Sequence, residues 1–284
     1  MIDPEIKITH KDTYFEHELI LEEKTVSGLA VWDLEMRIGV ASVRMGGIGG
    51  VGTDDKHRNK GYSRRVLENS NAWMEAEGFD CATLFGIPDY YPKFGYGVCL
   101  LDCGWEVRTR EAERANLTLT VRPSTEDDLP VLRDLYAANS ATLTGSIVRG
   151  EKTRWFAKGS RYGHPAEGVV FTDASGQVVA YAARDKEEDR VMVCEVGASS
   201  PEQFESVLRW AADRAVELRL EKITFQLPPG SLLADFLTQY GAKQTNRFPR
   251  QAGGMGRLLN LNAFLEKTLP EWTRRASQDR KSVV

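Results

Sequence analysis

The feature that most constrains this fold is a glycine-rich strand that leads through a basic loop into a helix. Glycine occupies five of the seven positions from 46 to 52, and the basic loop after them ends at Gly61. Before the glycines, residues 31–38 alternate between two faces, which is the period of a half-buried strand. After Gly61, apolar residues recur at helical spacing as far as Gly78, a residue type that commonly ends helices. The first half therefore alternates strands and helices, as α/β folds do.

The composition is that of an ordinary globular protein of two domains. The chain has 284 residues, of which 42% are hydrophobic and 27% charged, so a largely disordered chain is excluded. No apolar run is long enough to cross a bilayer and the first residues lack a secretory signal, so we expect a cytoplasmic protein without a membrane partner. A net charge of −4 argues against nucleic acid as a partner.

The four cysteines predict neither a disulfide framework nor a metal site. They are too few and too irregularly spaced for a set of structural disulfides. Cys99 and Cys103 would lie on one face of a strand pair, but structural zinc takes four ligands and no second pair of Cys or His stands nearby. We expect ordinary strand residues and no metal ion.

A polar stretch without periodicity, residues 111–116, predicts the domain boundary. The expected units are a first domain over 1–112, a second domain over 117–270 and a polar tail over 271–284. The second half reads as a strand, a helix, a hairpin, a strand, a helix, a strand and a helix, an order that parallels the first half. We therefore expect a structural duplication.

The glycines themselves allow one reading as a dinucleotide site. Gly47 to Gly52 matches the G-x-G-x-x-G fingerprint, which needs a helix that opens on the third glycine. Here the helical pattern starts about nine residues too late, which argues against this alternative. Binding of NADH would reveal such a site.

The other alternative is an anion site at the start of the helix. Free N–H groups and the positive dipole end of a helix N-terminus bind pyrophosphate. Gly61 lets phosphates approach the backbone, and Ser63 is small enough not to block them, while Arg58 and Lys60 add positive charge. The plain interpretation of the same residues is a solvated basic turn that binds nothing.

Two motifs at a fixed spacing favour the anion site. Arg58-x-x-Gly61-x-Ser63 resembles the R/Q-x-x-G-x-G/A signature of the GNAT acetyltransferase superfamily, and residues 91–96, Tyr-Pro-Lys-Phe-Gly-Tyr, resemble its Tyr-x-x-Phe-Gly-Phe/Tyr segment. With Met45–Val51 before the loop, the sequence is most similar to the tandem-domain branch typified by the enhanced-intracellular-survival acetyltransferases, without their sterol-carrier-like third domain. The resemblance implies an α/β (α+β) fold of two tandem GNAT-like domains, each with a mixed, mostly antiparallel central sheet flanked by helices.

The same resemblance implies an enzyme that acetylates a primary amine with acetyl-CoA as co-substrate. Tyr91 matches the family's general acid, which gives a proton to the departing CoA thiolate; the plain interpretation of Tyr91 is a packed aromatic ring. A backbone N–H near Val51 or Gly52 would polarise the thioester carbonyl. The residues implied to bind acetyl-CoA are Val51, Gly52, Thr53, Arg58, Asn59, Lys60, Gly61, Tyr62, Ser63, Arg64, Gly86 and Ile87.

The general base and the acceptor stay open. Asp33 and Glu35 could reach the acceptor through water, and the Val284 carboxylate could serve if the tail folds back. We expect the first domain to lack the front helices that wall the family's acceptor site. Either the second domain or another subunit of a homo-oligomer supplies that wall, or the start of the domain is missing from this sequence. Acidic residues between positions 16 and 35 would suit a cationic acceptor, either a small-molecule amine or a lysine side chain.

The second domain keeps the order of elements but lacks the cofactor signature. Where the basic loop should follow its fourth strand, it has Glu195 and Glu202, which would repel a pyrophosphate. We therefore expect one acetyl-CoA site per chain, in the first domain. The missing helices and base also leave a different function open: a non-catalytic acyl-CoA-binding or scaffold protein on a decayed acetyltransferase fold. Turnover separates the two.

Overall fold

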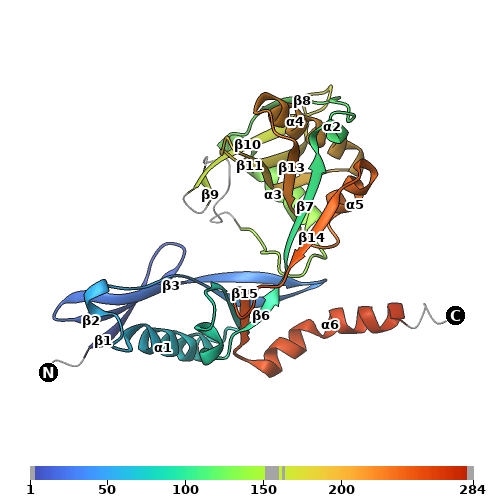
Figure 1. The fold of residues 1–284 in the computed structure, drawn as a ribbon. Coiled ribbons are helices and arrows are strands. Elements are labelled where there is room, and N and C mark those ends of the chain that lie inside the picture. Colours follow the sequence, from blue (N-terminus) through green and yellow to red (C-terminus); the bar gives the residue numbers. More distant parts are fainter. Residues whose placement is uncertain (1–3, 151–159, 162–163, 280–284) are drawn as a thin grey trace. The chain divides into compact units, whose positions relative to one another are not determined.

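The structure is a computed structural model that describes residues 4–150, 160–161 and 164–279. Contacts divide these residues into two compact units (Figure 1). The first unit contains the residues up to Asp102, the segment Thr144–Val148 and the residues from Phe248 onward; Cys103–Leu143 and the residues from Arg149 to Arg247 form the second. The interval 117–270 suggested for the second domain is thus not one continuous unit. Of the helices in the described part of the chain, none has the length and apolar character needed to cross a membrane.

A sheet of seven strands forms the centre of the first unit. Neighbouring strands are antiparallel except β4 and β5, which are parallel and joined through η1 (Asp55–His57) and α1 (Tyr62–Ala76). The strand expected over 31–38 is part of β3, and Gly78 lies just past the end of α1 as expected. In spatial order the strands are β1 (Glu5–His10), β2 (Phe15–Leu21), β3 (Lys24–Ile38), β4 (Ala41–Thr53), β5 (Cys81–Gly86), β15 (Gly253–Leu258) and β6 (Gly97–Leu100).

Helices cover both faces of this sheet. On one face, Val31 of β3 is buried in a cluster with Met74 of α1. On the other face, Met36 of β3 packs in a cluster with Phe264 of α6 (Leu261–Asp279). Since successive strand residues point to opposite faces, positions 31 and 36 lie on opposite sides. The helices α1 and α6 therefore sandwich the sheet.

Two buried carboxylates attach α6 to the first unit. Asp80 is fully buried and accepts a hydrogen bond from Lys267 Nζ at 2.7 Å. Glu271 is also fully buried and accepts from the backbone N–H of Val40 at 3.1 Å. The polar tail expected over 271–284 therefore begins inside a packed helix that continues to Asp279, because its charged residues include the one that fixes the helix to the sheet.

The second unit repeats this architecture. Its sheet is mixed: β12 and β13 are parallel and joined through α4 (Phe204–Glu217), as β4 and β5 are joined through α1. In spatial order the strands are β14 (Lys243–Arg247), β7 (Asp102–Arg108), β13 (Lys222–Gln226), β12 (Val191–Ala198), β11 (Val178–Asp185), β10 (His164–Thr172) and β8 (Thr120–Pro123), with β9 (Ser160–Arg161) paired to β10. The short helices are α2 (Thr109–Ala112), η3 (Glu126–Asp128), α3 (Leu129–Asn139), η5 (Pro201–Gln203), α5 (Leu232–Leu237) and η6 (Thr238–Tyr240). The expected fold class and duplication are confirmed.

The two sheets exchange a strand. In the first sheet, β15 comes from the end of the chain and lies between β5 and β6 (Figure 1, the red-orange strand beside the blue-green one). In the second sheet, β7 comes from the first half and lies at the corresponding place between β13 and β14. The chain therefore enters the second unit at Cys103, before the polar stretch 111–116 that suggested the boundary.

Candidate functional site

The parallel strands β4 and β5 separate at a defined point. Their register runs from Met45↔Cys81 to Ile48↔Leu84 and ends there, although β4 continues to Thr53. On its other edge β4 stays paired with β3, where the Ser27 hydroxyl donates to the carbonyl of Gly52 at 2.9 Å. Past Ile48, the edge of β4 that faced β5 has no strand neighbour among the described residues, so its backbone groups can pair with a ligand.

The helix that follows β4 has an N-terminus without a side-chain cap. Gly61 is the N-cap residue, with φ 79°, and has no side chain with which to cap the first turn. The first intrahelical bond is donated by Arg65 N to Gly61 O, at 3.1 Å. The N–H groups of the preceding residues have no acceptor within the helix, as at every helix start. A Cβ at position 61 would meet no atom within 4 Å, so the space in front of this turn is open.

The turn after β5 places Tyr91 against the end of that strand. Tyr91 is the first residue of η2 (Tyr91–Phe94) and is only 7% exposed. A Cβ at Gly86 would lie 2.9 Å from Tyr91 Cδ2 and 2.6 Å from Met255 Sδ, so the absence of a side chain at position 86 lets the phenol ring approach the strand. Burial raises the pKa of Tyr91, with a smaller contribution from Tyr90. The phenol is therefore protonated at neutral pH, as a proton donor must be.

The other aromatic residues of this segment hold it in place. Phe94 and Tyr96 are buried in the core of the first unit. The Tyr96 hydroxyl donates to Asn71 Oδ1 of α1 at 2.7 Å. Tyr91 belongs to the same buried cluster, so all three aromatic residues of the Tyr-x-x-Phe-Gly-Tyr pattern pack in the core, and Tyr91 lies in addition against the end of β5.

The structure brings some of the residues expected to bind acetyl-CoA together and leaves others apart. Gly86 lies against Tyr91, and the Ser63 hydroxyl lies 2.7 Å from the Tyr90 hydroxyl, which links the start of α1 to the same turn. Ile87 is 62% exposed beside them. Further out, the loop residues Arg58, Asn59, Lys60 and Arg64 are exposed, Tyr62 is half-buried, and Val51 packs against the core of the unit.

Two charges of the expected site have partners within the chain. The Arg58 guanidinium lies 2.7 Å from Asp55 Oδ1, an exposed ion pair that reduces the positive charge available to an anion. Asp33, one of the candidate bases, binds Arg44 through both carboxylate oxygens, at 3.0 and 2.7 Å. Glu35 accepts a hydrogen bond from the Ser42 hydroxyl. Val284 lies outside the described residues. The carboxylate of Asp33 is therefore engaged in an ion pair in this structure.

The corresponding region of the second unit is built differently. The parallel pairing of β12 and β13 also ends early, after Val193↔Phe225. Just past this point Glu195 forms an ion pair with Arg149 at 2.7 Å and accepts from the Tyr181 hydroxyl at 2.8 Å. The expected repulsion of phosphate by Glu195 is reduced by this partner, and the position is occupied instead by a side-chain network.

The helix start of the second unit is also capped by its own side chains. The segment before α4 carries a capping box formed by Ser200 and Gln203, in which Gln203 Oε1 accepts from the Ser200 N–H at 2.7 Å. In the first unit, the equivalent turn at Gly61 has no such cap. The two units therefore differ in that only the second caps this helix start with a side chain of the preceding segment.

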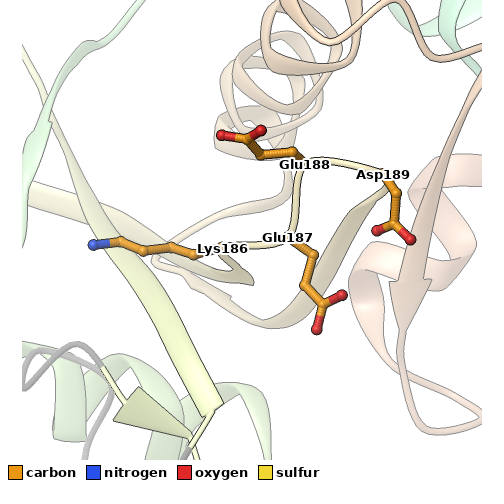
Figure 2. A pocket seen from close by; sticks show the side chains of 4 residues that line it. All are labelled: Lys186, Glu187, Glu188 and Asp189. Atoms are coloured by element: carbon orange, nitrogen blue, oxygen red, sulfur yellow. The ribbon is translucent and has the colours of Figure 1, made fainter.

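A shallow hollow in the second unit shows no sign of a site. It is lined by Lys186, Glu187, Glu188 and Asp189, which form the exposed turn between β11 and β12. Figure 2 shows these four side chains pointing in different directions, so they present no common group to a ligand. Nor do the described residues contain a cluster of three or more His, Cys, Asp or Glu that could hold a metal ion.

Comparison with known proteins identifies the family of the first unit's main segment. Residues 8–99 match the acetyltransferase (GNAT) domain family, and this range contains β4, the basic loop, α1 and Tyr91. This segment of the chain is therefore similar to GNAT acetyltransferase domains. No curated protein matches it in sequence.

Solved structures share the fold over most of the chain. A conserved protein of unknown function from Enterococcus faecalis V583, described as a probable N-acyltransferase, is 16% identical, with a TM-score of 0.71 over 90% of this chain and 64% of that one. A GCN5-related N-acetyltransferase from Anabaena variabilis ATCC 29413 is 19% identical, with a TM-score of 0.66 over 87% of this chain and 63% of that one. Eis1 from Mycobacterium abscessus is 16% identical, with a TM-score of 0.63 over 91% and 68%.

These similarities establish the tandem GNAT-like fold. At such low identities they concern the fold and not the reaction. The chain spans less than two thirds of the length of the first two of these structures.

Proposed function

We propose that this chain, which has a tandem GNAT-like fold, is an N-acetyltransferase that moves the acetyl group of acetyl-CoA directly to a primary amine. One observation carries the proposal: the uncapped N-terminus of α1 follows a strand, β4, that has lost its parallel neighbour. The first feature suits a pyrophosphate and the second suits an extended amide-bearing arm. Acetyl-CoA contains both groups in sequence.

The residues at this place fit acetyl-CoA as a co-substrate. The free backbone edge at Val51–Thr53 would pair with the amides of the pantetheine arm. The first-turn N–H groups of α1 would bind the pyrophosphate, with the exposed Lys60 and Arg64 as neighbouring positive charges. Gly61 leaves the approach to these N–H groups open. The network at Glu195 and the capping box of the second unit support a single site per chain.

The chemistry needs a nucleophile, support for the carbonyl oxygen and a proton for the leaving group. The neutral amine attacks the thioester carbon, a C–N bond forms, and the C–S bond breaks with its electron pair on sulfur. The attacking nitrogen then loses one proton to water, which leaves a neutral amide. A backbone N–H at Val51 or Gly52 would stabilise the negative charge that develops on the carbonyl oxygen. Tyr91 would give its phenolic proton to the thiolate, a role that its place beside Gly86 at the end of β5 supports.

The acceptor in this proposal is a small-molecule amine or a lysine-type side chain. The alternative function, acyl-CoA binding without turnover, shares the cofactor site but assigns no role to the Tyr91 proton. Release of CoA in the presence of amines, measured with wild type and Tyr91→Phe, separates the two functions.

The cofactor site is tested by calorimetric titration of acetyl-CoA into wild type, Gly61→Glu and Gly78→Glu. The two glycines lie at opposite ends of α1, have φ of 79° and 77°, and a Cβ on either would meet no atom within 4 Å. Both substitutions therefore impose a similar backbone strain and the same charge. Only Gly61→Glu places a carboxylate in front of the first-turn N–H groups.

The proposal expects acetyl-CoA binding that Gly61→Glu abolishes and Gly78→Glu retains. Equal loss in both variants would assign the effect to the helix rather than to the site. Absence of binding to wild type would overturn the proposed function.

A further inference from the structure

One hydrogen bond connects the start of α1 with the turn that carries Tyr91. Ser63 Oγ, in the first turn of α1, lies 2.7 Å from the Tyr90 hydroxyl. Both side chains are half-buried. The bond joins positions 27 residues apart in sequence, so it is a tertiary contact rather than a local cap.

Tyr90 also contacts the aromatic residues that follow it. Its ring lies 5.0 Å from the Tyr91 ring, edge to face, and 5.2 Å from the Phe94 ring. Tyr90 thus touches the proposed acid on one side and the first turn of the proposed phosphate site on the other. A displacement of Tyr90 would therefore disturb its contact with Tyr91, its hydrogen bond to Ser63, or both.

The backbone before Tyr90 turns sharply. Asp89 has φ 62°, a left-handed conformation that Asp adopts more readily than most residues with a side chain. Asp89 also lies 3.4 Å from Arg250, but that ion pair is exposed and such pairs stabilise little. The Ser63–Tyr90 bond is better shielded than this ion pair.

From these contacts we infer that Tyr90 is a positioning residue, which through Ser63 fixes Tyr91 relative to the first turn of α1. This inference rests on the proposed function, since it concerns the same cofactor site. Ser63 stands where the superfamily signature has Gly or Ala, and neither of those residues could make the bond. The hydrogen bond between the Ser63 and Tyr90 hydroxyls is therefore a feature of this chain, and it links occupation of the phosphate site to the position of Tyr91.

The test follows the Tyr91 side chain directly and needs no acceptor. Protein labelled with 13C at the tyrosine ring is titrated with acetyl-CoA, and the Tyr91 signal is assigned by its absence in Tyr91→Phe. The same titration is made with Ser63→Ala, Tyr90→Phe and the double variant, and calorimetry gives the dissociation constant for each. Ser63→Thr retains a hydroxyl at position 63 and serves as the conservative variant.

The inference expects acetyl-CoA to displace the Tyr91 signal in wild type and in Ser63→Thr. In Tyr90→Phe the displacement is largely lost while the dissociation constant changes little, because the backbone N–H groups of the first turn are unaltered. Ser63→Ala loses the displacement in the same way. The double variant falls no further than either single variant, because both remove the same bond. A response of Tyr91 equal to wild type in all variants would overturn the inference and leave the proposed function intact. Loss of acetyl-CoA binding already in wild type would overturn both.

Discussion

Gly39 lies directly against the carboxyl group of Glu271: a Cβ at position 39 would come closer than 3.0 Å to three atoms of that group. Gly39 has φ 59° and forms the turn between β3 and β4. Glu271 is fully buried there, and its pKa is held well below its usual range, chiefly by the hydrogen bond from Arg274 and also by Arg275 and the N–H of Val40. The absence of a side chain at Gly39 therefore leaves the space that the carboxyl group of Glu271, on α6, occupies.

Substitution of Gly39 should be far more costly than that of a glycine with open surroundings. We expect Gly39→Ala to lower the free energy of unfolding by about 2–5 kcal/mol, from the left-handed backbone and from overpacking against Glu271. Gly78→Ala shares the positive φ but meets no atom within 4 Å, so it should cost only about 1–2 kcal/mol. Urea unfolding of both variants measures the difference. Equal losses in the free energy of unfolding would show that the Glu271 carboxyl group does not lie against Gly39 in solution.

His17 should make the protein less stable as the pH falls below neutrality. It is fully buried, and burial lowers its pKa from 6.5 to about 4. Its Nδ1 lies 2.9 Å from Ser70 Oγ, which donates its own proton to Val66 O, so Nδ1 carries the hydrogen. The buried Nε2 has no partner among the described residues and would gain an unsatisfied proton on charging.

The sign and window of this effect follow from the depressed pKa. Above pH 6.5 the residue is neutral in both states and has no effect; from 6.5 down to about 4 the unfolded state binds a proton that the folded state does not. The free energy of unfolding should fall by about 1.4 kcal/mol per pH unit in that window. Urea unfolding at pH 7, 6 and 5 should show this slope in wild type and in the exposed control His10→Gln, and a flatter one in His17→Gln. An identical slope in His17→Gln would contradict the assignment.

Tyr91→Phe should affect turnover and not binding. The phenol proton is used only when the C–S bond breaks, so we expect kcat to fall about 10²–10⁴-fold while the dissociation constant of acetyl-CoA stays within a small factor. Because burial raises the pKa of Tyr91, the loss of activity that its ionisation causes should occur only above pH 10. Tyr240→Phe, in the second unit, is the matched removal of a hydroxyl. A Tyr91→Phe enzyme with wild-type kcat would leave the phenol as a packing residue.

Gly86→Ala should reproduce part of that defect without removing the phenol. The added methyl group would lie 2.6 Å from Met255 Sδ and 2.9 Å from Tyr91 Cδ2, so at least one of the two must move. We expect kcat to fall about tenfold or more through misplacement of Tyr91, with a smaller effect on acetyl-CoA binding. Gly97→Ala, on β6 with no atom within 4 Å, is the control for a glycine on a strand. Unchanged kcat in Gly86→Ala would show that the ring position is not critical.

The local architecture was predictable from the sequence at the places where the spacing of apolar residues changes from that of a strand to that of a helix, or stops. The alternation at 31–38, the change at Gly61 and the stop at Gly78 correspond to β3, the start of α1 and its end. The strand exchange was not predictable, since periodicity tells which residues form a strand but not which sheet receives it. Glu271 looked like part of a polar tail because its partner, the N–H of Val40, lies 231 positions away.

In the candidate site too, features that depend on residues close in sequence were predictable, and tertiary contacts were not. The spacing of the two motifs located the helix start and Tyr91, because both depend on residues close in sequence. The engagement of Asp33 by Arg44 and of Arg58 by Asp55 was not predictable, since composition does not show how charges pair. The motif spacing fits Tyr91 and not Tyr90, so the sequence assigns Tyr90 no role. Its hydrogen bond with Ser63 exists only in the fold.

The exchanged strands set the order in which the protein can be completed during synthesis. Leu258 of β15 pairs with Cys81 of β5, so the first sheet has no strand between β5 and β6 until the ribosome has made residues 253–258. Until then the nascent first half exposes two unpaired strand edges, which are the surfaces that recruit foreign strands. A first half made on its own would lack β15 between β5 and β6. It could complete its sheet only with a strand from another chain, as in domain-swapped dimers.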